Sequence, residues 1–282
     1  MTMIDAKELF KEWEKKIKKD ASELHERPMM NIIRVGNRPD TELYVNNKLA
    51  KAKRLGIEVC CIQLEDTTPQ EDLNGILNVM TKPTILQLPL PKHLDHKEAL
   101  RYLKPEYDVD GLTVTQKGML VDGDPKAMVP ATVKGIVKLI ESVTSIEGKK
   151  VAILSRSELV GRPLAEIVLQ KNGYPVVMHT HICDFIKMDE MRDSDIIVTA
   201  CGKRGIFTPS YFRRHGQVII DCSMYKEDGV DGVGDLDLLK MELKTEHKIA
   251  SGYGYTGPAT VLGLMENVVN YYILKGRDIN KK

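Results

Sequence analysis

The sequence predicts an α/β fold made of two domains with parallel sheets. Two observations predict it: short apolar runs alternate with longer amphipathic ones, and 282 residues at roughly 150 per domain suggest about two domains. Strands that alternate with helices are typical of βαβ units, and hence of parallel sheets. No internal repeat or low-complexity segment interrupts this order.

The first group of elements precedes a stretch that is rich in glycine. Its strands are predicted from short apolar runs at Met30–Val35, Ile57–Leu64 and Thr84–Leu88. Its helices are predicted at Leu43–Leu55 and Gln70–Met80. The segment Leu112–Lys126 has no clear period and contains Gly118, Gly123 and Pro125, so we expect a connection there.

The second group begins near Pro130 and is expected to form another open sheet. Its predicted strands are Lys150–Leu154, Val176–Met178, Asp195–Cys201 and Val218–Asp221. Its predicted helices are Val133–Ser142 and Leu164–Lys171. A long final helix over Val261–Leu274 could pack on either sheet.

Composition and charge exclude several classes of protein. Lys and Arg number 41 against 40 Asp and Glu, and a net charge of +1 disfavours a nucleic-acid partner, which requires a basic face. No apolar run approaches the roughly 20 residues that cross a bilayer, so we expect no membrane partner. The N-terminal segment has mixed charge and no apolar signal region.

The cysteines indicate a reducing compartment. There are five, an odd number at low density, and no CxxC pair occurs, which does not fit a disulfide framework. We therefore expect the protein in the cytoplasm. The adjacent Cys60 and Cys61 lie in an apolar run and would point to opposite faces of a strand, so we expect ordinary core cysteines.

One strand–turn–helix junction suits a phosphate group. The strand Val151–Leu154 runs into Ser155, Arg156 and Ser157 before a helix begins. A tight turn of this kind directs free backbone N–H groups at an anion, and an arginine can add bidentate contacts. The alternative is an ordinary turn with a solvated arginine, and spacing alone leaves both open.

A formal G-x-G-x-x-G precedes the last helix, at Gly252, Gly254 and Gly257. The dinucleotide fingerprint requires a following strand and an acidic residue about 20 residues further on. Here only the last helix and a charged tail follow. We therefore interpret the segment as a glycine-rich loop that lines a cleft.

Three polar side chains of the first group could carry chemistry. Tyr44 and Lys48 are four residues apart on a predicted helix and so share a face. Tyr-x-x-x-Lys also marks short-chain dehydrogenases, in which the pair follows the nucleotide-binding unit. Here the pair precedes that unit, so this family is disfavoured. The alternative is a snorkelling lysine beside a half-buried tyrosine. Gln87 lies in an apolar run that two prolines end, and it requires a partner if buried.

Two clusters could be read as metal sites. Asp108 and Asp110 place two carboxylates at a turn, but the other ligands of a calcium loop are missing. His179, His181 and Cys183 alternate and could ligate zinc if extended, or could end a strand in a solvent-facing loop. We expect no metal.

Considered together, the motifs have a distinctive order and spacing. They are Val35–Pro39 with Thr41, Tyr44 and Lys48; Gln87–Pro91; Pro105–Gly111; Arg156–Ser157 with Val160, Gly161 and Pro163; Gly234–Asp235; and Gly257–Pro258 with Thr260. Over about Val35 to Asn267 this set resembles the bifunctional methylenetetrahydrofolate dehydrogenase/methenyltetrahydrofolate cyclohydrolase family. The resemblance implies two α/β domains, the second a Rossmann-like parallel sheet, with a cleft between them.

The resemblance also implies roles for matching residues on the folate side. Lys48 resembles the general acid/base that acts on the one-carbon bridge, and Tyr44 the tyrosine that stacks on the folate and helps place that lysine. Gln87 resembles the partner that hydrogen-bonds and tunes the lysine. Asp110 matches the carboxylate that holds the pteridine ring, and Gly254 is expected among the substrate-binding residues.

On the cofactor side, the resemblance implies a set of binding residues. Arg156 and Ser157, with Ser155 before them, match the phosphate-binding turn. Thr180 falls where the family has a serine, so a hydroxyl is kept. Thr132 matches the threonine of the family's Pro-x-Thr-x-x-Gly. Met224 falls where the family has an isoleucine beside the nicotinamide.

Departures from the family pattern cluster on the same side. Ser155 replaces a glycine, Ser223–Tyr225 replaces Gly-Ile-Asn, and Ala250–Tyr255 replaces Thr-Pro-Val-Pro-Gly-Gly. Loss of a glycine adds bulk where a cofactor passes close to the backbone. His181 and Arg156 could still hold a 2′-phosphate, so NADP is the expected cofactor, with NAD as the alternative.

The resemblance implies an enzyme that oxidises methylenetetrahydrofolate to methenyltetrahydrofolate with NADP and hydrolyses the product to formyltetrahydrofolate in one-carbon metabolism. Its domains are expected at 1–118 plus 258–282 for folate and catalysis, and 119–257 for NAD(P). A homodimer is expected from the family alone. The alternatives are a cyclohydrolase-dominant enzyme with weak dehydrogenase, and a non-catalytic folate-binding relative.

Overall fold

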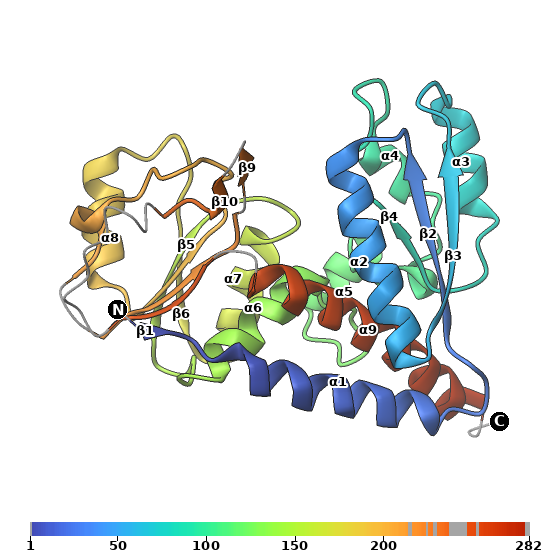
Figure 1. Cartoon of the computed structure of the whole chain (residues 1–282), viewed down its shortest axis with the longest axis horizontal. Coiled ribbons are helices and arrows are strands. Elements are labelled where there is room, and N and C mark those ends of the chain that lie inside the picture. Colours follow the sequence, from blue (N-terminus) through green and yellow to red (C-terminus); the bar gives the residue numbers. More distant parts are fainter. Residues whose placement is uncertain are drawn as a thin grey trace. The chain divides into compact units, whose positions relative to one another are not determined.

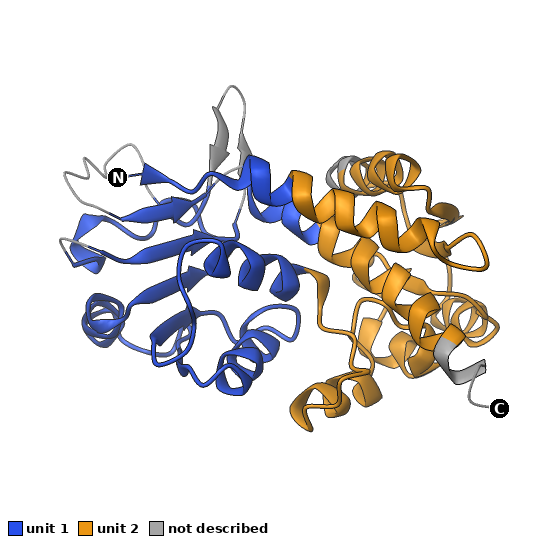
Figure 2. Ribbon diagram, turned by 90° about the horizontal axis from the view of Figure 1, so that it is seen from below, with its two compact units in different colours: residues 1–10, 132–260 blue, residues 11–131, 261–282 orange. Residues whose placement is uncertain are grey.

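The computed structural model describes residues 2–213, 216–223, 225–227, 230–236, 247–251 and 254–279. The chain folds into two compact units (Figure 2). Unit 1 contains residues 1–10 and 132–260, and unit 2 contains residues 11–131 and 261–282. Three helices each include a boundary between the units: α1 (Ala6–Ser22), α6 (Ala131–Glu141) and α9 (Thr256–Ile279). The last helix therefore contributes most of its length to unit 2.

Unit 2 is built on a small parallel sheet with the strand order β3-β2-β4 (Figure 1). Its strands are β2 (Met29–Val35), β3 (Glu58–Leu64) and β4 (Thr84–Leu86). In the register of the sheet, Ile32 lies between Cys61 and Ile85. The three predicted strands are confirmed, and β4 ends two residues earlier than expected, just before Gln87.

Helices of unit 2 cover a core of leucines and isoleucines. They are α2 (Pro39–Leu55), α3 (Gln70–Asn78), α4 (His96–Leu100), η1 (Pro105–Tyr107) and α5 (Val114–Val121), with parts of α1 and α9. Helix α2 begins at a proline, which suits a first turn, and ends at Gly56 in the left-handed conformation (φ 77°). Ile33, Leu73 and Leu77 are fully buried, and each such side chain stabilises the fold by about 1.5–3 kcal/mol.

Two expectations about unit 2 were wrong. The segment Leu112–Lys126 is not a plain connection, because α5 forms within it where the Thr113 side chain caps the Gln116 N–H (3.4 Å). Cys60 and Cys61 are exposed, not core residues. They lie on β3, which is the edge strand of the sheet, and an edge strand keeps less of its surface covered.

Unit 1 contains a six-stranded parallel sheet with the order β1-β11-β8-β7-β5-β6. Its strands are β1 (Thr2–Met3), β5 (Lys150–Leu154), β6 (Tyr174–Val177), β7 (Ile196–Thr199), β8 (Val218–Asp221) and β11 (Lys248–Ala250). A separate antiparallel pair joins β9 (Tyr225–Glu227) and β10 (Val230–Val233). The predicted strands of the second group are all present; β5 and β8 have the predicted ends, whereas those of β6 and β7 differ.

One helix of unit 1 precedes β5, and the others connect successive strands from β5 to β8. They are α6 (Ala131–Glu141), α7 (Gly161–Gln170), α8 (Asp184–Asp193) and η2 (Pro209–Tyr211). All residues of β7 and β8 are buried, as expected for parallel strands that are covered on both faces. Sequence patterns missed β1, β11 and α8, because the two strands are only two and three residues long and α8 has little apolar periodicity.

The strand order of unit 1 creates a ligand position. After β5 the chain adds β6 on one side of it, and then crosses to add β7 on the other side. At such a switch in direction, the loops that leave neighbouring carboxyl ends separate and leave a crevice.

No helix among the described residues is long and apolar enough to span a membrane.

Candidate active site

Lys48 lies on α2 and is anchored to the end of the unit 2 sheet. Its Nζ donates a hydrogen bond to Gln87 Oε1 at 2.7 Å. The backbone N–H of Gln87 donates to Ile33 O (2.8 Å), and its side-chain Nε2 donates to Leu88 O (2.7 Å). The Gln87 amide is therefore fixed with its oxygen directed at the lysine, and the structure supplies the partner that the buried glutamine requires.

The electrostatic setting of Lys48 favours a neutral amine. Burial lowers the pKa of Lys48, and the charge of Asp110 opposes this by raising it. Burial likewise raises the pKa of Asp110, opposed by the charge of Lys48 and by the Ala131 N–H. Each group thus titrates in the field of the other.

Asp108 shapes the turn that carries Asp110. Its buried carboxylate accepts hydrogen bonds from the N–H groups of Asp110 (3.1 Å), Gly111 (2.9 Å) and Thr113 (2.6 Å). Burial raises the pKa of Asp108 to about 6. Gly111 has φ 71°, and a Cβ there would lie 2.0 Å from Met128 O, so only glycine fits. The paired carboxylates therefore have distinct positions: one is bound to its own loop and the other faces Lys48.

The two remaining folate-side predictions lie on exposed segments. Tyr44 is one turn before Lys48 on α2 and is 44% exposed, so its ring is available to a ligand. Gly254 is exposed just before α9 and belongs to unit 1. Its neighbours Gly252 and Tyr253 lie outside the described residues.

Unit 1 contains a cavity of about 550 Å³ at the carboxyl ends of β5, β6 and β7. Ser155 and Arg156 follow β5, His179 and Thr180 follow β6, and Cys201 follows β7. This is the crevice that the strand order creates. Three predicted cofactor residues, Ser155, Arg156 and Thr180, therefore line one cavity.

The turn after β5 is closed by its own serines. Ser155 Oγ lies 3.1 Å from Ser157 Oγ, and Ser157 Oγ accepts from the N–H groups of Val160 (3.2 Å) and Gly161 (3.4 Å). A Cβ on Gly161 would lie 2.0 Å from the Ser155 carbonyl oxygen. The first residue of α7 must therefore be glycine for the helix to begin this close to the turn.

Other predicted cofactor residues lie elsewhere or are not described. Thr132 is on the first turn of α6, with its hydroxyl 3.4 Å from that of Thr260, and neither Thr132 nor Ser157 belongs to the cavity lining. His181 also stands outside that lining, and its N–H donates to His179 Nδ1 (3.2 Å). Met224 lies outside the described residues.

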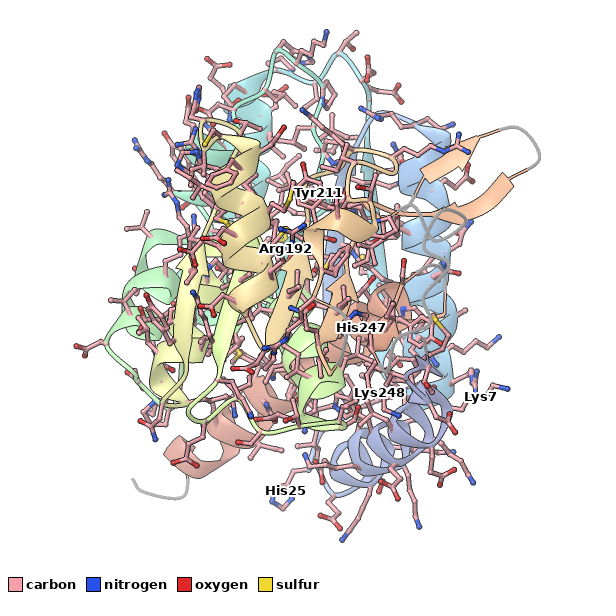
Figure 3. All side chains as sticks on the ribbon, turned by 90° about the vertical axis from the view of Figure 1, so that its left-hand side faces the viewer. Lys7, His25, Arg192, Tyr211, His247 and Lys248 are labelled. Atoms are coloured by element: carbon pink, nitrogen blue, oxygen red, sulfur yellow. The ribbon has the colours of Figure 1, made fainter. Side chains whose placement is uncertain are left out.

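The cavity has lining residues that sequence patterns did not identify. Lys187 and Lys203 add basic groups to Arg156, while Phe207 and Tyr211 add apolar surface. Tyr211 ends η2, and Arg192 of α8 donates to the carbonyl oxygen of the preceding Ser210 (2.8 Å). Figure 3 labels Arg192 and Tyr211 on these elements. A lone lysine in a loop carries no sequence signal, because only the fold shows which loops share a crevice.

Two buried aspartates hold the loops that form this cavity. Asp221, at the end of β8, accepts from Ser223 N–H (3.0 Å) and Leu236 N–H (3.0 Å), and burial raises its pKa to about 6. Asp235 accepts from the N–H groups of Cys201 (2.7 Å) and Lys203 (2.9 Å). These carboxylates fix the backbone beyond β7, so they position the cavity wall without lining it.

The chemistry of the cavity fits a phosphorylated dinucleotide. Basic side chains at Arg156, Lys187 and Lys203 suit phosphate groups, and the apolar walls at Met178 and Phe207 suit flat rings. Desolvation and the nearby charge of Arg156 lower the pKa of His179, which disfavours the charged form of this ring. Among the described residues, no three His, Cys, Asp or Glu side chains form a group that could hold a metal ion.

Comparison with known proteins places the chain in a family. Residues 4–110 match the catalytic domain of tetrahydrofolate dehydrogenase/cyclohydrolase, and residues 130–275 match its NAD(P)-binding domain. The bifunctional protein FolD of Agathobacter rectalis is 30% identical over 276 residues, which cover 95% of this chain and 97% of that protein.

Solved structures agree with these matches. The bifunctional FolD methylenetetrahydrofolate dehydrogenase/cyclohydrolase from Campylobacter jejuni superposes with a TM-score of 0.90 at 26% identity, covering 98% of this chain and 99% of that one. The dehydrogenase-cyclohydrolase of Trypanosoma brucei, in complex with NADP and an inhibitor, superposes with a TM-score of 0.89 at 27% identity, with the same coverage.

Proposed function

The chain belongs to the tetrahydrofolate dehydrogenase/cyclohydrolase family, and from that premise we propose how its own residues perform the reactions of the family. The enzyme oxidises methylenetetrahydrofolate to methenyltetrahydrofolate with NADP, and then hydrolyses the product to formyltetrahydrofolate. The proposal concerns the residues that carry out these two steps, their cofactor contacts and the assembly of the chain.

Lys48 is the proton-transfer group of the hydrolysis. A neutral amine accepts a proton from the water that attacks the methenyl carbon, and the resulting ammonium returns a proton when the carbon–nitrogen bond breaks. Burial favours the neutral form, and Gln87 holds the amine at 2.7 Å in one position. The single observation that carries this assignment is that fixed Lys48–Gln87 contact beside the Asp110 carboxylate.

Asp110 and Tyr44 hold the substrate around Lys48. A carboxylate can accept hydrogen bonds from the N–H groups of a pteridine ring, and Asp110 is already oriented by the Ala131 N–H. The exposed ring of Tyr44 offers an aromatic face on the same side of α2 as Lys48. Gly254 remains a proposed substrate-binding residue on the resemblance of its motif.

The cavity of unit 1 holds the cofactor. When bound, NADP accepts a hydride from the methylene carbon, and the protein contributes binding and orientation. Arg156, Lys187 and Lys203 hold phosphate groups, and Ser155 and Thr180 contribute hydroxyls at the same edge. Thr132, Ser157 and Met224 remain proposed cofactor residues on the resemblance of their motifs.

A paired substitution on α2 tests the catalytic assignment. Lys48→Met should lower kcat/KM for methenyl hydrolysis by about 10²–10⁴-fold, because general acid/base catalysis contributes that much. Lys53→Met is the matched control, since Lys53 is exposed on the same helix, and should retain hydrolysis. NADP binding should be unchanged in both variants. Undiminished hydrolysis in the Lys48→Met enzyme would remove Lys48 from the mechanism.

A second candidate is a cyclohydrolase-dominant enzyme with a weak dehydrogenase. The buried Ser155 at the cofactor turn favours it, because the family has a glycine there. Steady-state hydride transfer with NADP and with NAD separates the two: absence of turnover with both cofactors, with hydrolysis retained, would favour the second candidate. A non-catalytic folate-binding relative is disfavoured by the assembled Lys48, Gln87 and Asp110.

We also propose a cytoplasmic homodimer that uses a folate and no nucleic-acid or membrane partner. The five cysteines are free thiols, which suits a reducing compartment. The folate-binding domain is proposed at 1–118 plus 258–282, and the NAD(P)-binding domain at 119–257. Light scattering of the purified chain tests the assembly, and a monomer mass at working concentration would contradict it.

A further inference from the structure

Asn267 of α9 joins the two backbone segments that meet at Asp110. It is 1% exposed, and its Nδ2 donates to Val109 O (2.8 Å) and to Val129 O (2.9 Å). Val109 directly precedes Asp110. Val129 is two residues before Ala131, whose N–H hydrogen-bonds the Asp110 carboxylate. One side chain therefore sets both the place of the carboxylate and the place of a donor that orients it.

The two segments are in unusually close contact, so small displacements at one are transmitted to the other. Gly111, next to Asp110, has φ 71°, and a Cβ there would lie 2.0 Å from Met128 O and 3.3 Å from the Pro130 ring. Asp108 further locks the turn through the N–H groups of Asp110 and Gly111. In a packed interior such contacts transmit strain, since few voids absorb it.

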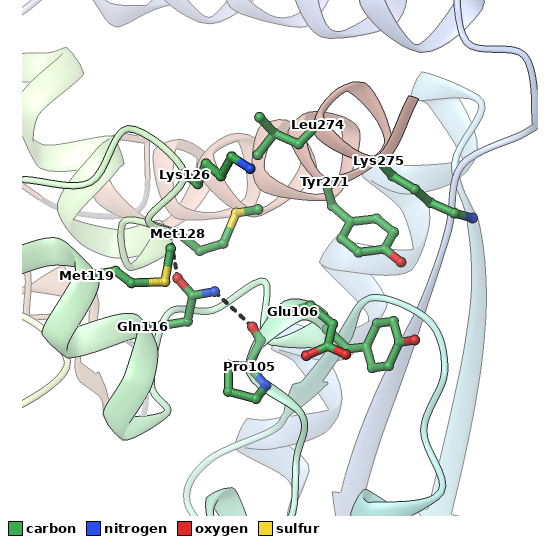
Figure 4. Close-up of a pocket in the computed structure, with 10 residues that line it drawn as sticks. Pro105, Glu106, Gln116, Met119, Lys126, Met128, Tyr271, Leu274 and Lys275 are labelled. Atoms are coloured by element: carbon green, nitrogen blue, oxygen red, sulfur yellow. Dashed lines mark hydrogen bonds between the residues drawn. The ribbon is translucent and has the colours of Figure 1, made fainter. Parts of the chain in front are cut away.

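A second buried carboxamide joins the same two segments at a greater distance from Asp110. Gln116 of α5 donates through Nε2 to Pro105 O (2.8 Å), and its Oε1 accepts from Met128 N–H (2.8 Å; Figure 4). Pro105 is five residues before Asp110, and Met128 is three residues before Ala131. Gln116 also lines a cavity of about 510 Å³ in unit 2 that holds none of Tyr44, Lys48 or Asp110.

We propose that Asn267 is a positioning residue of the active site, which acts on the folate reaction by holding the Asp110 carboxylate in register with its Ala131 donor. The inference rests on the proposed role of Asp110 and extends it to a residue on the last helix. Gln116, in contrast, contributes to the stability of unit 2 with little effect on the reaction. Removing either carboxamide breaks similar hydrogen bonds. A comparison of the two variants therefore separates an effect on positioning from an effect on stability.

Matched substitutions in the full chain test the proposal. Asn267→Leu and Gln116→Met remove each carboxamide with little change of volume, and Asn270→Leu is a control on the same helix, where Asn270 is only half-buried. Thermal unfolding and NADP binding report the fold. For methenyl hydrolysis, Asn267→Leu should lower kcat/KM on the order of tenfold to a hundredfold, the effect of misplacing a group by about 1 Å. Gln116→Met should melt at a similarly reduced temperature with kcat/KM near that of the native enzyme.

A pH profile and a double substitution exclude a merely structural effect. Displacing Asp110 weakens the charge that raises the pKa of Lys48, so the acid limb of kcat/KM should move to lower pH in Asn267→Leu only. In an Asp110→Asn background, Asn267→Leu should cause little further loss. If Asn267→Leu does not fold, Asn267→Ser, which keeps one donor, should show a smaller effect in the same direction.

The outcomes distinguish the two levels of the proposal. Equal kinetic losses in Asn267→Leu and Gln116→Met, with an impaired Asp110→Asn enzyme, would overturn the positioning role alone. An Asp110→Asn enzyme with native kinetics would contradict the proposed function of Asp110, and the positioning role with it. Losses confined to Asn267→Leu and absent from the Asp110→Asn background establish the inference.

Discussion

The Lys48 site of unit 2 and the cofactor cavity of unit 1 are constructed in different ways. At Lys48 the chemistry depends on two functional groups. The Lys48 amine is hydrogen-bonded to Gln87, and the Asp110 carboxylate is hydrogen-bonded to the Ala131 N–H. At the cavity, the walls come from residues at the ends of β5, β6 and β7, and the backbone there is held by Asp221 and Asp235, which lie outside the lining. The residues that depart from the family pattern belong to unit 1, where backbone can supply what a side chain does not.

This difference teaches how the two sites tolerate substitution. A site that uses one functional group at one position loses its chemistry when that group changes. A site whose walls are set by the course of the backbone tolerates a new side chain, provided that the backbone keeps that course. Ser155 illustrates this, because its hydroxyl contributes to the hydrogen bonds that close the turn. The following substitutions test that contrast.

The largest effect is expected where the backbone of the cavity cannot keep its course. Gly161→Ala places a methyl group 2.0 Å from the Ser155 carbonyl oxygen. Relief of that contact should shift the turn, lower the free energy of unfolding by about 1–3 kcal/mol and weaken NADP binding. Calorimetric titration and thermal unfolding measure both, while methenyl hydrolysis should persist below the melting temperature.

Gly75→Ala is the control for that substitution. Gly75 lies on α3 with no atom within 4 Å of an added Cβ. Alanine there should stabilise the protein by about 0.5–1 kcal/mol, because glycine weakens a helix interior. NADP affinity that survives Gly161→Ala unchanged would show that the turn does not contact the cofactor.

The next effect concerns a side chain of the cavity. Arg156→Gln removes a charged donor from the phosphate position, which should raise the Kd for NADP by about tenfold to a hundredfold. Arg162→Gln is the matched control, because Arg162 is exposed on α7 and does not line the cavity. Fluorescence titration with NADP and NAD gives the affinities. Equal losses in the two variants would indicate a general charge effect instead of a phosphate contact.

The electrostatic coupling in unit 2 predicts a change in pH dependence. Hydrolysis requires neutral Lys48, so kcat/KM should rise as the pH increases through the pKa of that amine. The negative charge of Asp110 raises this pKa, and Asp110→Asn removes it, so the acid limb should move to lower pH. Initial rates across a pH series provide the test. A limb that moves to higher pH would show that another group limits the reaction.

The smallest effect is expected at the position that departs from the family. Ser155→Gly restores the glycine but removes the hydroxyl that accepts from the Ser157 N–H (3.3 Å). Added backbone freedom should lower the free energy of unfolding by about 0.5–1 kcal/mol. NADP affinity should change by less than about threefold, since the turn keeps the course of its backbone. A tenfold gain in affinity would mean that the serine obstructs the cofactor.

The sequence by itself determined the α/β class, the family and all strands of the two sheets except the short β1 and β11. It could do so because parallel strands that are covered on both faces are continuous apolar runs, as in β7 and β8, and because motif order survives divergence. It also selected Lys48, Gln87 and Asp110, through the motifs that resemble the family. These features are local in the chain, so a reading along the chain can find them.

Only the tertiary structure decided which distant residues share a site. The fold brought Lys187, Lys203 and Tyr211 into one cavity with Arg156, and brought Asn267 of the last helix to the segments around Asp110. It also formed α5 within a glycine-containing stretch and left Cys60 and Cys61 exposed on an edge strand. Such outcomes depend on contacts between residues far apart in the chain, and no local pattern encodes them, because burial and hydrogen bonding are completed only when the elements pack.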